Sequence, residues 1–397
     1  MVQSVVFLSK EKGYSIGYLS VFLYDDSMST TNTLYRLAKA FQDEAISEVF
    51  SENDLICVIN EKQEVYYVSI AESALAAYRG ERGLSGYLEI SLADDDLPDI
   101  EYLELQHQQD CLLMLLEESL QDLEIEDQKA IEESAVQFSK GSFPEFRSKT
   151  QYAYIVPITK EEEADLIIIL QALLYAKEYF SHYKKEGRNN SFLCWLEEQG
   201  LEDVEQKEYI PTFTVQDDSF VVTAQVLKDD AYGMLYPQAF FTNEERQLYY
   251  KRLKPKVGRI FYVAIGVMPN PVVSERDGKR IIFPMYQMVY DPQTDQILDL
   301  YMVEDYEQEH GQFIARLLEL IDHELKPQAI HCYGKRTMPL LSKIGKQIGI
   351  MVVEGIEKER MQSLLMEMFK EFSSDHHQHH HVHGPDCGCD DHTHDDE

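Results

Sequence analysis

Apolar and polar residues along the N-terminal half follow two different periods. Residues 1–25 alternate around Gly13 and Gly17, which predicts a β-hairpin, and residues 55–79 hold three short apolar runs that we interpret as strands. Between them, the apolar residues from Thr33 to Phe50 recur every three or four positions, as in an amphipathic helix. This half of the chain is therefore expected to mix helices with sheet.

The clearest helix signal is the sequence Thr159-x-x-Glu162, a capping box in which each side chain bonds a free backbone N–H of the other residue. It predicts a helix that runs to about Lys185. The other elements expected in this half are a glycine-rich helix at Gly80–Ile90, one or two amphipathic helices at 107–138 ended by Phe143-Pro144, a short helix at Ser191–Gln199, and strands within Tyr209–Val226.

The pattern changes again near Pro255, and we place a domain boundary at about 240–257. Beyond it the predicted order is β-β-β-α-β-α-β-α, which is typical of a mixed sheet with helices on its faces and is the strand order of the ribonuclease H-like fold. The elements are strands at Arg259–Met268, Arg280–Tyr290, Ile297–Val303, Gln328–Tyr333 and Ile350–Glu354, and helices at 307–324, Thr337–Ile348 (closed by Gly349) and Lys358–Phe372.

Taken together, these patterns predict an α+β protein in three parts. The N-terminal α+β domain spans 1–245, with a break near 95–106 that would allow two subdomains. The C-terminal ribonuclease H-like domain spans 256–373. Residues 374–397 form a His-, Cys- and Asp-rich tail that has no apolar surface to bury and is expected to be disordered without metal.

The composition is typical of a globular protein with hydrophobic cores, because 44% of residues are hydrophobic and 11% are aromatic. The net charge of −35 repels phosphate backbones and argues against a nucleic-acid-binding protein. The first 25 residues lack the basic start and clean apolar run of a signal peptide, and the longest apolar stretch, around Leu166–Ala176, is too short for a bilayer. A cytoplasmic protein without membrane contact is expected.

Six cysteines give no disulfide framework. Cys57, Cys111, Cys194 and Cys332 stand singly in mostly apolar segments and are expected to be buried thiols, as is usual in a reducing compartment. The other two, Cys387 and Cys389, lie in the tail.

The tail concentrates the donors that transition metals prefer, since imidazole and thiolate bind Zn²⁺, Ni²⁺, Co²⁺ and Cu. Cys387, Cys389, His392 and His394 form a C-x-C-x₂-H-x-H set that could surround one tetrahedral Zn²⁺. The remaining histidines would supply looser, interchangeable sites; they are His376, His377, His379, His380, His381 and His383. The sequence therefore predicts Zn²⁺ or Ni²⁺ at the tail, bound more weakly below about pH 6 because the ligands must be deprotonated.

Two other interpretations of the tail stay open. One is a purification tag, although Gln378, Val382, Thr393 and the segment from Gly384 to Cys389 interrupt the histidines. The other is an acidic segment that keeps the protein soluble and binds metal only in a test tube.

Two stretches resemble a bacterial family that pairs two domains of unknown function. The first runs from Leu34 and ends in Tyr78, Gly80, Gly83 and Leu84; the second begins at RIFYVAIGVMPNPV and continues through GKRIIFPMYQMVYDPQTDQILDLYMVED. The resemblance covers residues 33–372 and implies a fold rather than an activity. Some relatives end in a SecA-type zinc motif with two Cys-containing pairs, and this chain keeps one pair.

The sequence favours a non-catalytic binding or adaptor protein that buffers or delivers zinc or nickel and has a protein partner still to be identified. The alternative is a divergent ribonuclease H-like nuclease, which needs carboxylates on its first and fourth strands and its last helix to hold two metal ions. Here those strands offer Tyr262–Gly266 and His331–Tyr333, and only Glu357 and Glu359 near the last helix match.

Overall fold

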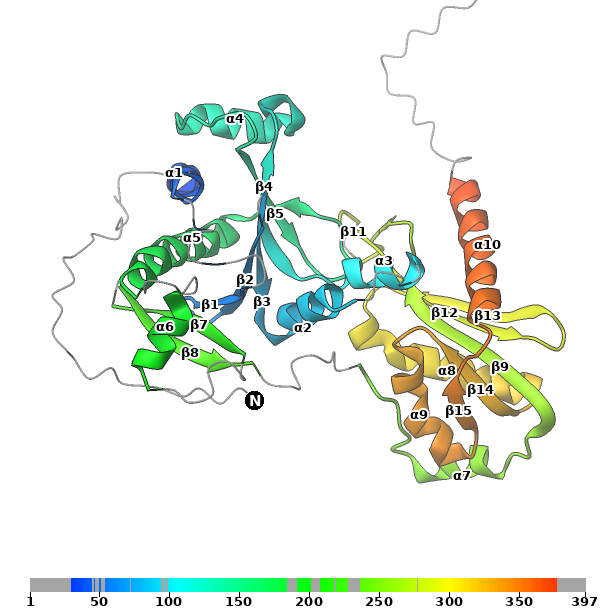
Figure 1. The fold of residues 1–397 in the computed structure, drawn as a ribbon. Coiled ribbons are helices and arrows are strands. Elements are labelled where there is room, and N and C mark those ends of the chain that lie inside the picture. Colours follow the sequence, from blue (N-terminus) through cyan, green and yellow to red (C-terminus); the bar gives the residue numbers. More distant parts are fainter. Residues whose placement is uncertain are drawn as a thin grey trace, which may run out of the picture. The chain divides into compact units, whose positions relative to one another are not determined.

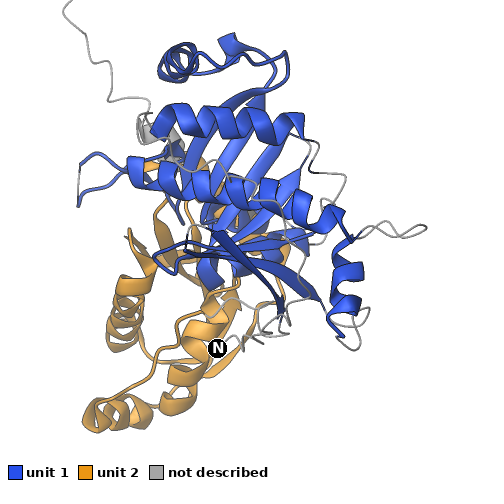
Figure 2. Cartoon of the chain, turned by 90° about the vertical axis from the view of Figure 1, so that its left-hand side faces the viewer, with its two compact units in different colours: residues 1–235, 273–282 blue, residues 236–272, 283–397 orange. Residues whose placement is uncertain are grey.

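The computed structural model describes residues 30–44, 46, 50, 54–71, 73–93, 97, 99–183, 191–200, 208–217, 219–227, 236–276 and 278–376; of these, residues 99–100 and 371–376 are described by their backbone alone. The hairpin expected at residues 1–25 and the tail beyond His376 lie outside these ranges. The chain forms two compact units, shown in Figure 2. Unit 1 comprises Met1–Leu235 and Val273–Ile282, and unit 2 comprises Tyr236–Val272 and Phe283–Glu397. Both combine helices with sheet, so the expected α+β class is confirmed.

In its described residues, unit 1 is built on an eight-stranded sheet with the order β6-β5-β4-β3-β2-β1-β7-β8. Neighbouring strands are antiparallel, except that β1 and β7 are parallel. The strands are β1 (Ile56–Ile59), β2 (Val65–Ala71), β3 (Ala74–Arg79), β4 (Cys111–Glu117), β5 (Phe143–Lys149), β6 (Val156–Pro157), β7 (Tyr209–Gln216) and β8 (Ser219–Val226).

Helices cover both faces of this sheet, as Figure 1 shows. Alternation along the strands sends neighbouring side chains to opposite faces, so Ile56 and Val58 face the larger core while Cys57 faces the smaller one. On the larger core pack α1 (Thr30–Asp43), α4 (Ile125–Ser134), α5 (Lys160–Ser181) and α6 (Ser191–Glu198); α2 (Gly80–Ser91) covers the smaller core, with α3 (Asp99–His107) beside it.

The helices predicted over 107–138 are wrong in their first half. Cys111–Glu117 forms β4, an inner strand of the sheet, and after it helix appears only in the short η2 (Leu120–Asp122) and in α4. The run CLLMLLE is apolar on both sides because both faces of the sheet are covered, and such a run has no period of two to reveal a strand. Phe143-Pro144 ends no helix; it opens strand β5.

In the described residues of unit 2, the main sheet has five strands in the order β13-β12-β9-β14-β15. Strands β9 and β12 are antiparallel, as are β12 and β13, whereas β14 runs parallel to both β9 and β15. The strands are β9 (Lys256–Val267), β12 (Met285–Asp291), β13 (Gln296–Val303), β14 (Pro327–Tyr333) and β15 (Met351–Glu354).

Helices pack on both faces of this second sheet. Ile314 of α8 (Tyr306–Glu324) and Leu341 of α9 (Thr337–Ile348) meet Ile330 of β14 on one face. On the other face the ring of Phe369, from α10 (Lys358–His376), meets Tyr286 edge-on at 5.6 Å. The short α7 (Glu244–Arg252) precedes β9.

The strand predicted over Arg280–Tyr290 is two elements. Ile281–Ile282 is β11, which pairs with β10 (Val272–Val273) in a small hairpin, and β12 begins only at Met285, after Pro284. The predicted closure of α9 is confirmed, because Gly349 follows it in the left-handed conformation at φ +73°. Among the described helices, none combines the length and the apolar character that a bilayer crossing requires.

Candidate functional site

The metal donors predicted from the sequence fall at the edge of the described chain or beyond it. His376 is the last residue of α10, and its side chain is not described. The others lie outside the described residues: His377, His379, His380, His381, His383, Cys387, Cys389, His392 and His394. Among the residues that the structure does describe, no three His, Cys, Asp or Glu side chains gather as metal ligands would.

The strand residues that the nuclease alternative would need as carboxylates are aromatic. The Tyr262 ring of β9 stacks on His331 of β14 at 5.3 Å with 8° between the ring planes, and it meets Tyr333 at 5.3 Å. Tyr262, Tyr290 and Tyr333 are 5%, 1% and 7% exposed, so these rings are part of the core. Burial raises the pKa of Tyr262, and the nearby Glu357 carboxylate raises it further.

The carboxylates expected near the last helix do not meet in a site. Glu357 pairs with Arg360 at 3.4 Å, and Arg360 in turn donates to the Tyr290 hydroxyl at 2.7 Å. The backbone carbonyl of Glu359 accepts from the Ser363 hydroxyl, and its side chain is exposed at the start of α10. These contacts fasten the start of α10 to the sheet.

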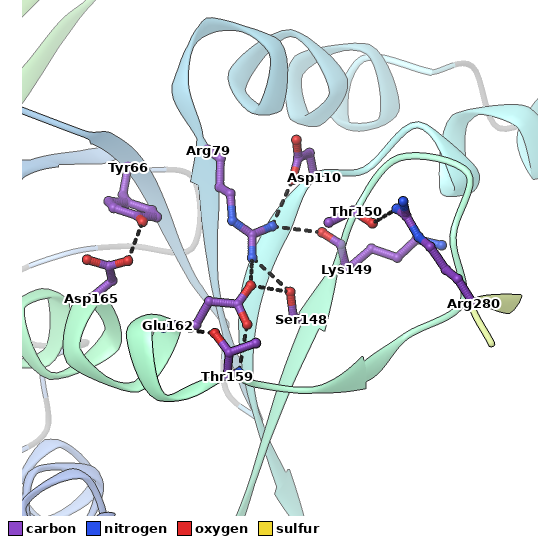
Figure 3. Close-up of polar contacts among 10 residues, drawn as sticks. All are labelled: Tyr66, Arg79, Asp110, Ser148, Lys149, Thr150, Thr159, Glu162, Asp165 and Arg280. Atoms are coloured by element: carbon purple, nitrogen blue, oxygen red, sulfur yellow. Dashed lines mark hydrogen bonds and ion pairs between the residues drawn. The ribbon is translucent and has the colours of Figure 1, made fainter. Parts of the chain in front are cut away.

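A dense polar cluster lies in unit 1, around Arg79 at the end of β3 (Figure 3). One Arg79 nitrogen, Nη1, donates to Asp110 Oδ1 at 2.7 Å and to the Lys149 carbonyl at 3.0 Å. The other, Nη2, donates to Ser148 Oγ at 2.8 Å and to Glu162 Oε1 at 2.6 Å. A single guanidinium thus joins β3, the start of β4, the end of β5 and the start of α5.

The predicted capping box completes this cluster. Thr159 Oγ1 accepts from the Glu162 N–H at 3.3 Å, and Glu162 Oε2 accepts from the Thr159 N–H at 2.8 Å. Glu162 Oε1 also accepts from Ser148 Oγ at 2.6 Å. Burial alone would raise the pKa of Glu162, but the hydrogen bonds from Ser148 and Thr159 and the charge of Arg79 together lower it. This carboxylate therefore stays ionised and holds Arg79.

Beside this cluster, Lys149, His107 and Cys111 bury titratable groups. Cys111 and Lys149 stand directly opposite each other on β4 and β5. Burial lowers the pKa of Lys149 to about 8. Burial and the charge of Lys149 lower the pKa of His107 to about 4, and burial raises that of Cys111 to about 12. At neutral pH the group thus combines a neutral imidazole, a protonated thiol and an ammonium that loses its proton close to pH 8.

The Lys149 ammonium points into the chain rather than outward. The residue is 7% exposed, and its Nζ donates to the Ala153 carbonyl at 2.6 Å. The backbone N–H of Tyr152 donates to the His107 carbonyl at 2.7 Å, so the turn after β5 is held to the end of α3. These contacts order the turn at Thr150–Tyr154.

The sequence did not predict the group of Lys149, His107 and Cys111 beside Arg79, for one reason. It placed His107 and Cys111 on a helix, so the strand that brings Cys111 opposite Lys149 was not considered. The capping box at Thr159 was the available signal, because Glu162 is both its partner and the carboxylate that holds Arg79.

Comparison with known proteins gives two matches to family models. Residues 32–194 match the Domain of unknown function (DUF7309), and residues 249–370 match the Domain of unknown function (DUF6930). No curated protein matches the chain. The pairing of two domains expected from the resemblance is thereby confirmed, whereas the zinc motif of some relatives stays a prediction.

Proposed function

We propose that this chain, which pairs two domains of unknown function, is a non-catalytic binding protein whose C-terminal tail holds Zn²⁺ or Ni²⁺. The observation that carries the proposal is the concentration of eight of the 13 histidines and two of the six cysteines between His376 and His394. These are donors that zinc and nickel favour, and the spacing from Cys387 to His394 suits one tetrahedral ion.

The arrangement of unit 2 supports a ribonuclease H-like domain that binds rather than cleaves. Its sheet order puts β9 in the centre, with two antiparallel strands on one side and two parallel strands on the other. Buried Tyr262 and Tyr333 occupy strand positions where metal-holding carboxylates would be needed, and Glu357 is engaged by Arg360. These contacts favour the binding role over the nuclease alternative.

Cysteine usage supports a reducing compartment such as the cytoplasm. Cys57, Cys111, Cys194 and Cys332 are buried free thiols. From the donors in the tail, the partners we propose are transition-metal ions and a protein that receives or supplies them.

Metal analysis tests this function directly. Full-length protein, dialysed against Zn²⁺ or Ni²⁺ and then against buffer, should retain at least one ion, and a chain ending at Ser374 should retain none. A full-length variant with every tail His changed to Asn and every tail Cys to Ser separates the donors from tail length and should also be empty. As a matched control, Asp386, Asp390, Asp391, Asp395 and Asp396 are changed to Asn, and this variant should keep its metal. Equal metal content in all four proteins would end the proposal.

A further inference from the structure

The segment Lys251–Gly258 of unit 2 runs from the end of α7 into the start of β9 and concentrates positive charge (Figure 1). Its sequence, KRLKPKVG, has four cations and no acid, in a chain with 71 Asp and Glu against 36 Lys and Arg. All four cations, Lys251, Arg252, Lys254 and Lys256, are exposed. We call this segment the basic turn.

The backbone of the basic turn is held in place within unit 2. The Leu253 carbonyl accepts from Lys326 Nζ at 3.1 Å, and the Lys256 N–H donates to the Lys326 carbonyl at 2.9 Å. The Gly258 N–H donates to Gln328 Oε1 at 2.9 Å. Because the backbone is already ordered, a partner that binds the four cations has less conformational entropy to overcome.

Within the described part of the chain, no carboxylate forms an ion pair with these four cations. Two acids at the end of α8 are engaged by other residues. Asp322 accepts from the hydroxyls of Tyr249 at 3.2 Å and Tyr250 at 2.9 Å, and Glu324 pairs with Arg259 at 3.1 Å. The positive charge of the basic turn is therefore available to a partner.

The fold accounts for only half of this charge. A helix C-terminus favours nearby cations, so Lys251 and Arg252 in the last turn of α7 stabilise that helix. Lys254 and Lys256 lie beyond the helix, with only Pro255 between them, and their like charges repel each other. An anionic partner would offset that repulsion.

Two exposed apolar side chains lie at the basic turn, Val257 within it and Leu325 beside it. They are 90% and 57% exposed, and each adjoins a residue of the backbone bond between Lys256 and Lys326. Leu325 has a φ of +76°, and backbone strain of this kind gathers at functional sites. A partner therefore meets aliphatic surface as well as positive charge.

We propose that the basic turn and Leu325 form a docking surface for an acidic segment of a partner protein that also carries aliphatic side chains. The carboxylates of such a segment complement the four cations, and its aliphatic side chains cover Val257 and Leu325. Nucleic acids and anionic membranes fit less well, because they extend past the turn and meet the rest of a protein whose net charge is −35. The docking surface rests on the proposed function only in that it requires a protein partner, and it needs no metal.

Fluorescence anisotropy with labelled peptides and full-length protein tests this proposal, in the presence of a chelator so that no metal on the tail binds the peptide. A peptide of repeated Glu-Glu-Leu units should bind, and its affinity should fall as the salt concentration rises from about 0.05 to about 0.15 M. A Gln-Gln-Leu peptide lacks the charge, and a peptide of Glu alone lacks the aliphatic side chains. Each should bind about tenfold more weakly or worse.

Two variants locate the binding. Lys254→Glu/Lys256→Glu should weaken binding of the Glu-Glu-Leu peptide about tenfold or more, because two attractive charges become repulsive. Leu325→Gly removes the side chain and relieves its backbone strain, and it should weaken binding about three- to tenfold. The control, Lys62→Glu/Lys129→Glu, reverses two exposed lysines of unit 1 and should bind as the wild type does.

Loss of binding in both variants, with the control unchanged, supports the docking surface. It is overturned if the Glu-Glu-Leu peptide does not bind, if binding ignores either variant, or if the control loses as much. Tighter binding of an oligonucleotide or of phosphatidylserine vesicles, lost in the same variants, would also overturn it. Without chelator, both variants should hold as much metal as the wild type, so failure of the docking surface leaves the metal proposal standing.

Discussion

Among the described residues, each unit buries one lysine to a similar extent, and the two lysines make different contacts. Lys326 in unit 2 is 3% exposed and Lys149 in unit 1 is 7% exposed. The ammonium of Lys326 donates to the carbonyls of Tyr250 at 2.9 Å, Leu253 at 3.1 Å and Ile348 at 2.6 Å. These acceptors lie at the ends of α7 and α9, where helices leave carbonyls without partners. Lys149 instead donates to Ala153, four residues away in its own turn.

The difference shows what decides the role of a buried charge. Lys326 joins two helix ends that are 22 and more than 70 residues away in sequence, so it stabilises tertiary structure. Lys149 orders the local turn at Thr150–Tyr154. Burial lowers the pKa of both lysines, and the value of about 8 for Lys149 brings its titration within reach of physiological pH.

The largest effect is expected from Lys326→Met. Three buried carbonyls would lose their donor, at a net cost of about 3 kcal/mol after the burial of the charge is relieved. Trp195, the sole tryptophan of the sequence, lies in unit 1, so fluorescence follows the unfolding of unit 1. Circular dichroism follows both units, and the unfolding of unit 2 is the part of its transition that fluorescence does not report. Urea unfolding should show a destabilised unit 2. A loss no greater than that of Lys346→Met, at an exposed lysine of α9, would contradict the role given to Lys326.

The second effect is expected from Arg79→Lys, which keeps the charge. An ammonium cannot reach four acceptors that are arranged for a planar guanidinium, so unit 1 should lose about 2 kcal/mol of unfolding free energy. The Trp195 fluorescence transition in urea measures the loss. Arg82→Lys, at an exposed arginine of α2, is the matched control, and equal midpoints for the two variants would refute the prediction.

Lys149→Met should change the unfolding free energy of unit 1 by only about 1 kcal/mol at pH 7, because the lost bond to Ala153 is offset by the removed buried charge. Its signature is pH dependence. The folded pKa of about 8 lies below the unfolded value of about 10.4, so between these values the unfolded chain binds more protons. The wild type should gain stability relative to the variant as the pH rises from 8 to 10. A constant or shrinking difference would contradict a lowered pKa.

The smallest effect is expected next to Lys326, at Leu325. Its φ of +76° and ψ of 145° strain any residue with a side chain, and 57% of the residue is exposed. Leu325→Gly should relieve this strain and stabilise unit 2 by up to about 1 kcal/mol, measured by the same urea unfolding. If the variant is less stable, the Leu325 side chain stabilises unit 2 by more free energy than its backbone strain costs.

Local signals in the sequence predicted those elements whose ends are chemically marked. The capping box fixed the start of α5 at Thr159, and Gly349 fixed the end of α9. Strand β4 was missed because Cys111–Glu117 is apolar on both faces, so its spacing fits a helix as well as a strand. Pro144 was taken as a terminator, yet β5 pairs with β6 only at Arg147 and Ser148, so a residue without an N–H is tolerated at its outer edge.

The clusters were less predictable than the elements, because they depend on pairing between strands far apart in the chain. Nothing local indicates that Lys149 lies opposite Cys111, or that Lys326 reaches both Tyr250 and Ile348. Composition alone motivates the proposal of metal binding at the tail, because that chemistry depends on the residues present rather than on how the chain folds.

The division of unit 1 into two stretches of sequence, Met1–Leu235 and Val273–Ile282, also matters for how the protein is made. Unit 1 is discontinuous in sequence, and the ribosome must add roughly fifty residues after Leu235 before Ile282 exists, which takes a few seconds at bacterial or eukaryotic rates of synthesis. During that interval the turn at Thr150–Tyr154 lacks Ile281 and Ile282, which pair with it in the finished chain. A gene cut after codon 235 would make this interval permanent, so a fragment meant to represent unit 1 would lack one of its strands.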